Sequence, residues 1–188
     1  MVPDDDLVKF SGEHLFYEIT MLYQATLKLA KSEADPLCGN ALIESFGIHS
    51  AIILDFMLNN KDTEDDAIAN HYIRDEMAWK KINSVYRKKL NFIYRRRNKE
   101  LAHLSYERLK VTADTKNWSF IAIAREIADL VDSFIDSARP NLLHIKVKTL
   151  KGHFQNHPIC KGIPNFYNLP LISKPTEGDN PKRGHNAL

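Results

Sequence analysis

Apolar side chains recur at steps of three and four residues through most of the first 150 positions, and this periodicity is the strongest constraint on the fold. The segment 118–138 is the clearest case, with an apolar set of Ile121, Ala124, Ile127, Ala128, Val131, Phe134 and Ile135. This spacing places the set on one face of an α-helix. No segment alternates apolar and polar residues between hairpin-type turns, so the sequence argues against strands.

Comparable patterns predict three more helices, over residues 10–32, 41–58 and 67–93. Pro36 and Gly39 punctuate the connection before the second of these, and Asn40 is placed to cap it. The second helix is apolar on most sides, which predicts a central and buried position. We therefore expect an all-α fold, an up-and-down bundle of four to five helices with short connections.

The character of the chain changes at Gly152. Five of the eight prolines and four of the seven glycines lie from this residue onward. Residues 153–173 nevertheless remain apolar, so we expect them to lie extended across the bundle or across a partner. Residues 174–188 have the composition of a disordered tail. The predicted organisation is a helical bundle over residues 1–150 and an irregular, Pro-rich C-terminal segment over residues 151–188.

Features of a membrane or secreted protein are not evident in the sequence. The longest apolar stretches, such as residues 51–58, are interrupted by Asp55 and are shorter than a bilayer requires. The N-terminal segment is acidic and lacks the basic and apolar regions of a secretory signal. Cys38 and Cys160 are too few and too far apart for a disulfide framework. We expect a cytoplasmic protein that makes no membrane contact.

The small net charge of +2 conceals a strong asymmetry along the chain. Residues 1–79 hold 15 acidic and 5 basic side chains, whereas residues 80–99 hold nine basic side chains and no acidic one. Charge concentrated in this way favours a polyanionic partner such as a nucleic acid. It is equally compatible with a basic helix face that lies against the acidic half of the same or a neighbouring subunit.

The stretch YRRRNKELAHL, residues 94–104, contains the side chains with the most chemistry. Arg97 keeps its charge at every accessible pH and can hold a phosphate. His103 titrates near neutrality and can move a proton at that phosphate. The two groups suffice in principle to cleave RNA through its own 2′-hydroxyl without a metal. The spacing alone is not specific, because Arg139 and His144 show a similar one.

One straight helix cannot bring Arg97 and His103 together. Six residues of an ideal α-helix rise about 9 Å and rotate about 240°, so the two side chains do not share a face. A site therefore requires a bend or a helix start near Arg97, or a second copy of the chain across a two-fold axis.

The motif RNKELAH, residues 97–103, resembles the Arg-polar-x(3–5)-His signature of HEPN domains (higher eukaryotes and prokaryotes nucleotide-binding). A second stretch, residues 40–58, is similar to a helix of the abortive-infection-associated branch of that family. The matching positions there are Glu44, His49, Leu54, Asp55 and Phe56. The resemblance covers about residues 10–140. The chain departs from the pattern at Ser50 and Ala51, where the family has an arginine shortly after the histidine.

The resemblance implies a metal-independent endoribonuclease whose products carry a 2′,3′-cyclic phosphate, of the kind found in toxin–antitoxin and anti-phage defence systems. It implies a composite site at a homodimer interface, with Arg97 and His103 as the catalytic pair. Asn98 would orient this pair, and Glu44 would support it as a carboxylate. The cations expected to attract RNA are Lys88, Lys89, Arg95, Arg96 and Lys99. RNA and a nucleotidyltransferase-like antitoxin are the implied partners, and no cofactor or metal is expected.

Other interpretations stay open at this point. The chain could be a non-catalytic HEPN module that binds a nucleotide or a partner protein, or a structural helical dimer with a basic exposed face. We interpret His49 as a core histidine paired with a carboxylate, because a polar group on an apolar helix needs a partner. Zinc ligation by His153, His157 and Cys160, completed by Cys38 or His144, is disfavoured by their spacing.

Overall fold

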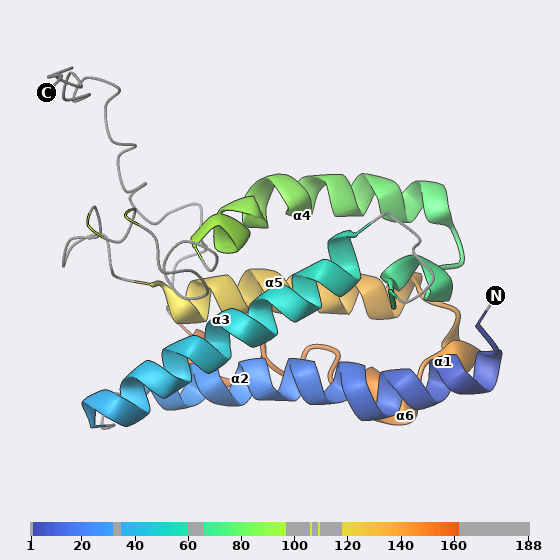
Figure 1. Cartoon of the computed structure of the whole chain (residues 1–188). Coiled ribbons are helices and arrows are strands. Elements are labelled where there is room, and N and C mark those ends of the chain that lie inside the picture. Colours follow the sequence, from blue (N-terminus) through green and yellow to red (C-terminus); the bar gives the residue numbers. More distant parts are fainter. Residues whose placement is uncertain are drawn as a thin grey trace, which may run out of the picture.

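The computed structural model describes residues 2–31, 35–59, 66–96, 106, 109 and 118–161, without the side chains of Tyr94 and Arg95. Across this part of the chain the fold is all-α, as the periodicity predicts, and contains no strand. Figure 1 shows the long helices packed along one another, with successive helices running in opposite directions. The predicted up-and-down helical bundle is therefore confirmed.

The first helical run begins earlier than predicted. It consists of α1 (Asp4–Phe10), a π-helical segment (Ser11–Leu15) and α2 (Phe16–Ala30), which follow one another without a break. Three aspartates occupy the first turn of α1, where carboxylates interact favourably with the helix dipole. The π-helical segment packs against the C-terminal part of the chain, since Ser11 Oγ accepts a hydrogen bond of 2.9 Å from the backbone N–H of His144.

The next helix, α3 (Pro36–Leu58), begins five residues before the predicted position 41. Its cap is Asp35, whose Oδ1 accepts hydrogen bonds from the backbone N–H groups of Leu37 at 2.9 Å and Cys38 at 3.2 Å. Pro36 occupies the first turn, where its fixed φ suits a helix and its missing N–H costs nothing. The expectation that Asn40 caps this helix was wrong, because the proline starts the helix instead of preceding it.

The second half of α3 is central to the bundle, as predicted, and its first half is exposed on one side. Phe46, Ile53, Leu54 and Met57 are fully buried. Within the described residues α3 is also the one helix long and apolar enough to cross a membrane by length and composition, contrary to the expectation from its apolar stretches. Core helices of soluble folds share these properties, and 50% of its most apolar window is buried inside the bundle.

The helix α4 (Glu76–Arg96) is shorter than the predicted helix 67–93 at its start. A 3-10 turn (Ala69–Tyr72) precedes it, and Ile73 then forms an isolated antiparallel bridge with Ala138. Backbone hydrogen bonds from Arg74 N to Ser137 O (3.1 Å) and from Arg139 N to Tyr72 O (2.8 Å) flank this bridge. These contacts attach the chain before α4 to the end of the helix that comes after α4 in the sequence.

The helix α5 (Phe120–Ser137) lies within the predicted segment 118–138 and supplies much of the core. The ring of Phe134 lies at the centre of an aromatic cluster. Its centroid is 5.5 Å from that of Phe56, 5.8 Å from that of Tyr72 and 6.0 Å from that of Trp79, each with steeply inclined planes. Such edge-to-face pairs add specific geometry to the burial of apolar area.

After α5 the chain turns back across the bundle through a 3-10 turn (Pro140–Leu142), α6 (Ile145–Lys148) and a second 3-10 turn (Pro158–Cys160). Phe154 is buried and stacks on Tyr23 of α2 with ring centroids 4.6 Å apart. Residues 153–160 therefore pack on the bundle, but through turns and not along the extended path that we predicted. Residues 162–188, which include the predicted disordered tail, lie outside the described residues.

Candidate functional site

The residues of the predicted catalytic pair lie outside the part of the chain that the structure describes. This applies to Arg97, Asn98 and His103, and also to Lys99. Arg95 belongs to α4, but the structure does not describe its side chain. The arrangement of the pair stays a prediction, and the structure informs it through the residues on either side.

Arg96, the last residue of α4, lies directly before the predicted pair and makes a defined contact. Its guanidinium carbon is 4.4 Å from the ring centroid of Trp118, a cation–π arrangement. Trp118 is buried and meets Phe46 of α3 edge to face, with centroids 6.0 Å apart. The position that precedes Arg97 is therefore held where the end of α4, the start of α5 and the middle of α3 meet.

Glu44, the predicted supporting carboxylate, is exposed on α3. It lies two residues before Phe46, a rotation of about 200° around the helix, so it points away from the contact between Phe46 and Trp118. It forms no ion pair or hydrogen bond with the described residues. A supporting role for Glu44 therefore requires a contact with residues outside the described part or with a second copy of the chain.

The cations of α4 fall into two groups. Lys80, Lys81 and Lys88 are exposed and form no ion pair within the described part of the chain. In contrast, the Nζ of Lys89 lies 3.3 Å from Oε2 of the buried Glu126 on α5, and the Arg87 guanidinium donates a hydrogen bond to the carbonyl of Leu58. The first group carries the positive charge that α4 offers to solvent.

The acidic groups of α5 hold the C-terminal segment in place. Asp132 accepts hydrogen bonds of 3.0 and 3.1 Å from the backbone N–H of Gly152, and Asp129 accepts one of 2.6 Å from Gln155 Nε2. Burial raises the pKa of both aspartates, and the negative charge of Glu126 further raises that of Asp129. These carboxylates have structural partners.

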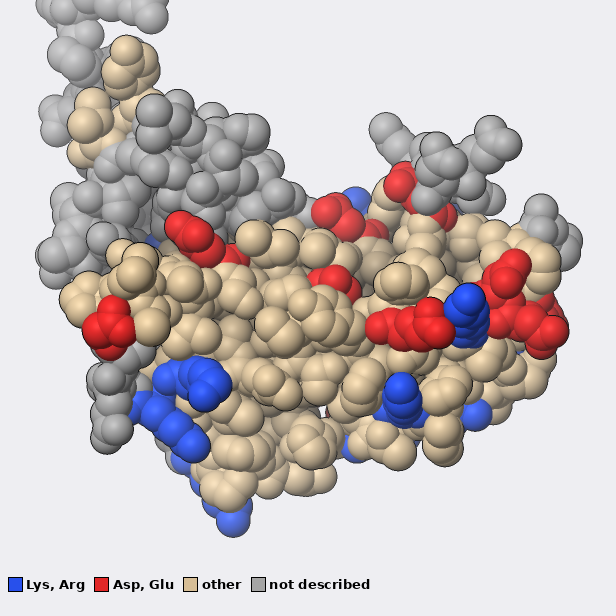
Figure 2. All heavy atoms as spheres, turned by 60° about the horizontal axis from the view of Figure 1, so that its bottom comes forward, with Lys and Arg blue, Asp and Glu red and all other residues tan. Residues whose placement is uncertain are grey.

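Charge is also divided between the two ends of the bundle. Figure 2 views the bundle from the side of α1 and α2, where acidic side chains gather at one end and much of the centre is uncharged. The first turn of α1, which carries Asp4, Asp5 and Asp6, lies at the end opposite to the last turn of α4 (Figure 1). A polyanion is therefore disfavoured at the α1 end relative to the end that holds Arg96.

The pairing of His49 agrees with its interpretation as a core histidine. Its Nδ1 is 2.6 Å from Oε2 of Glu18 on α2, and its ring meets Tyr17 edge to face with centroids 5.8 Å apart. His49 is 9% exposed, so the carboxylate satisfies a largely buried imidazole. This contact ties α2 to α3.

A zinc site around Cys160 has no support in the structure. No group of three or more His, Cys, Asp or Glu side chains among the described residues is arranged to hold a metal ion. The thiol of Cys160 is buried 3.2 Å from the carbonyl oxygen of Phe154, and His157 Nδ1 accepts a hydrogen bond from the backbone N–H of Ile159. Each group has a local structural role.

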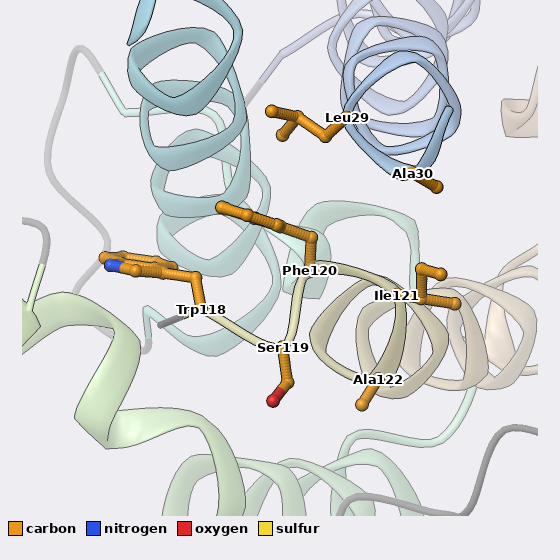
Figure 3. A pocket seen from close by; sticks show the side chains of 7 residues that line it. All are labelled: Leu29, Ala30, Trp118, Ser119, Phe120, Ile121 and Ala122. Carbon is orange, nitrogen blue, oxygen red and sulfur yellow. The ribbon is translucent and has the colours of Figure 1, made fainter. Parts of the chain in front are cut away.

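The structure also contains a pocket that the sequence did not reveal. It has a volume of about 280 Å³ and lies between the end of α2 and the start of α5. Leu29 and Ala30 form one side, and Trp118, Phe120 and Ile121 form the other (Figure 3). No pattern in the sequence indicates this pocket, because its two sides are about 90 residues apart and consist of ordinary apolar residues.

Comparison of the chain with protein-family models, with curated proteins and with solved structures found no match. The resemblance to HEPN domains therefore stays a prediction from two motifs in the sequence, and the structure confirms only the all-α fold.

Proposed function

We propose that the protein is a metal-independent endoribonuclease of the HEPN type that acts as a homodimer. The observation that carries this proposal is the position of Arg96. Its contact with Trp118 anchors the end of α4 immediately before the Arg97–His103 motif, and α4 also bears Lys80, Lys81 and Lys88, which form no ion pair with the described residues.

The cations of α4 supply the electrostatic attraction for RNA. Lys81 and Lys88 are seven residues apart, so they lie on one face of the helix about 10 Å from each other. The next position in this spacing is Arg95, two residues before Arg97. The exposed charges of Lys81 and Lys88 thus lead along α4 towards the proposed reaction site, as a phosphate backbone requires.

In the proposed reaction, the 2′-oxygen of the RNA attacks the adjacent phosphorus and the bond to the 5′-oxygen breaks. His103 takes the proton from the 2′-hydroxyl or gives one to the leaving 5′-oxygen, and water exchanges the other proton. Arg97 stabilises the negative charge on the crowded phosphorane, and Asn98 orients the pair. The products carry a 2′,3′-cyclic phosphate and a 5′-hydroxyl, and no step needs a metal.

Helix geometry allows a bend or a helix start near Arg97 or a second copy of the chain, and we propose the second copy. Arg97 and His103 do not share a face of a straight helix, so two copies related by a two-fold axis provide a site in which each copy supplies complementary groups. Light scattering on the full chain tests this step. A strictly monomeric protein that cleaves RNA would contradict the composite site.

The principal test compares wild type with His103→Ala on end-labelled RNA in the presence of EDTA. We expect cleavage by wild type, products with cyclic phosphate ends, and loss of cleavage in the variant. The matched control is His49→Gln, which changes a histidine outside the motif and is expected to retain cleavage. Equal cleavage by wild type and His103→Ala, or cleavage by neither, would contradict the proposal.

The salt dependence of RNA binding tests whether the cations of α4 contact the phosphates. Removing one phosphate contact with Lys88→Gln is expected to reduce the slope of log K against log salt by about 0.7 for single-stranded RNA. Lys9→Gln, at an exposed position on α1, is the control for the loss of one positive charge. Identical slopes for the two variants would show that α4 is not part of the RNA-binding surface.

The proposed role as a toxin or abortive-infection effector makes a separate prediction in cells. Expression of the wild type should arrest growth, His103→Ala should not, and a nucleotidyltransferase-like protein encoded beside it should relieve the arrest. Growth arrest by both forms would contradict a nuclease toxin.

A further inference from the structure

The pocket at the start of α5 has the volume and the apolar lining of a site for a group with an apolar face. Its volume is about 280 Å³, and its walls are the side chains of Leu29, Phe120 and Ile121 together with the ring of Trp118. Figure 3 shows the side chains of Phe120 and Ile121 directed towards α2, whereas the Ser119 hydroxyl points away from them. Ligand pockets are commonly apolar in this way, with polar groups at the margin.

The pocket shares a wall with the end of α4. Trp118 lines the pocket and also receives the guanidinium of Arg96 at 4.4 Å from its ring centroid. Arg97 follows Arg96 directly in the chain, so we expect the proposed phosphate site near this wall of the pocket.

The charges around the pocket determine which part of a nucleotide it suits. The lining residues carry no charged side chain, so a phosphate has no partner inside, while Arg96 contacts the ring of Trp118 and Lys28 and Lys31 flank Leu29 and Ala30 in the chain. A base can enter an apolar pocket because each of its faces is a π surface that tolerates aromatic and aliphatic walls. The adjoining phosphate then remains outside, beside the cations of α4.

We infer that this pocket binds one unpaired nucleobase of the RNA, next to the phosphate held by the Arg97 site. The inference rests on the proposed function, and it specifies the substrate class as single-stranded RNA. A base in a duplex is stacked on both faces and paired along one edge, so it cannot enter the pocket unless it is extruded.

The test uses the full-length protein and a short 2′-O-methyl RNA, which binds but cannot react because its 2′-oxygen is blocked. Binding is measured by fluorescence anisotropy for the intact oligonucleotide and for versions with a single abasic position. We expect one abasic position to weaken binding about tenfold, as base stacking on aromatic side chains commonly does. Equal affinity for the intact and all abasic oligonucleotides, or no binding to any of them, would overturn the inference.

Filling the pocket provides the second arm. Ala30 is exposed at the rim, so Ala30→Trp places a large ring in the pocket without disturbing the core. This variant should bind the intact oligonucleotide about as weakly as wild type binds the abasic one. Gln24→Trp, at an exposed position on the same helix that does not line the pocket, should bind like wild type. Wild-type affinity in Ala30→Trp overturns the inference.

Base-dependent binding and RNA cleavage are measured separately, so failure of the pocket inference can be distinguished from failure of the proposed function. His103→Ala should retain base-dependent binding, so a protein that discriminates abasic RNA but never cleaves supports the pocket and contradicts the nuclease. A further arm examines occupation of the pocket by the chain itself. If Phe166→Asp produces base-dependent binding that the wild type lacks, the C-terminal segment fills the pocket and the inference is overturned.

Discussion

The guanidinium of Arg96 lies 4.4 Å from the centre of the Trp118 ring, so the last residue of α4 contacts the residue that precedes the N-cap of α5. Trp118 in turn packs against Phe46 of α3. One buried indole thus joins three helices and bears on the pocket described above. The stretch with the predicted catalytic residues begins at this junction.

The Arg96 contact predicts that replacing Arg96 lowers RNA cleavage much more than it lowers stability. Arg96→Gln should lower the free energy of unfolding by only about 0.5–1 kcal/mol, the usual worth of an accessible cation–π pair. RNA cleavage should fall at least about tenfold, because small displacements of positioning groups are costly for catalysis. Urea unfolding and single-turnover cleavage measure the two effects. A loss of cleavage no greater than that of Lys9→Gln would show that Arg96 does not position the site.

The His49–Glu18 pair predicts a structural effect without a catalytic one. Glu18→Ala leaves the largely buried imidazole without its partner at 2.6 Å, and should cost about 1–3 kcal/mol of stability. Glu18→Gln keeps an acceptor oxygen and should cost less. Cleavage per folded molecule should match wild type in both variants. A selective loss of cleavage in a fully folded Glu18→Gln protein would instead place His49 in the reaction.

The aromatic cluster predicts where the core is least tolerant. Phe134 is fully buried among Phe56, Tyr72 and Trp79, so Phe134→Ala should cost about 3–5 kcal/mol through lost burial and the cavity left behind. Ile135→Ala, on the same helix but partly exposed, should cost clearly less. Chemical denaturation of both variants gives the comparison, and equal losses would contradict the position of the cluster.

Periodicity was sufficient to predict the helices, but local signals were ambiguous at their ends. Pro36 disfavours a helix interior yet suits a first turn, and only the cap supplied by Asp35 distinguishes these cases. The start of α4 could not be predicted from neighbouring residues at all. It depends on the pairing of Ile73 with Ala138, which are 65 positions apart in the chain.

The same contrast, between local sequence signals and contacts of residues distant in the chain, applies to the candidate site. The exposure of Lys88 and the pairing of His49 could be predicted from the sequence because charge and isolated polar groups are local properties. The identity of the partner, Glu18, required the packing of α2 on α3. The contact of Arg96 with Trp118 and the adjacent pocket arise from three helices that are distant in sequence, so no local pattern indicates them.

The close approach of the π-helical segment to His144 gives a further prediction. A Cβ added at Gly12 would lie 2.5 Å from Cγ of His144, which is shorter than any tolerable contact. Gly12→Ala should therefore destabilise the protein by about 1–3 kcal/mol, the usual cost of overpacking. Adding His144→Ala should restore part of this loss by making room. Destabilisation that is strictly additive in the double variant would contradict steric contact as the cause.

Asp129 gives a prediction about pH. Burial and the charge of Glu126 raise the pKa of Asp129 above its ordinary value of 3.8, so the folded protein binds more protons than the unfolded chain just above pH 3.8. Stability contributed by this group must therefore fall as pH rises from 3.8 through the raised pKa, which is opposite to the usual behaviour of a salt-bridged carboxylate. Asp129→Asn keeps an oxygen for the hydrogen bond from Gln155 and removes the charge.

The variant should accordingly be at least as stable as wild type at pH 7, and should lose less stability between pH 4 and pH 6. Urea midpoints measured across this range provide the comparison. Asp55→Asn, at an exposed position on α3, controls for the removal of one negative charge from an acidic surface. If Asp129→Asn is less stable at pH 7 while its pH profile parallels that of wild type, the carboxylate stabilises the fold in its charged form. The assignment of its raised pKa to burial beside Glu126 is then wrong.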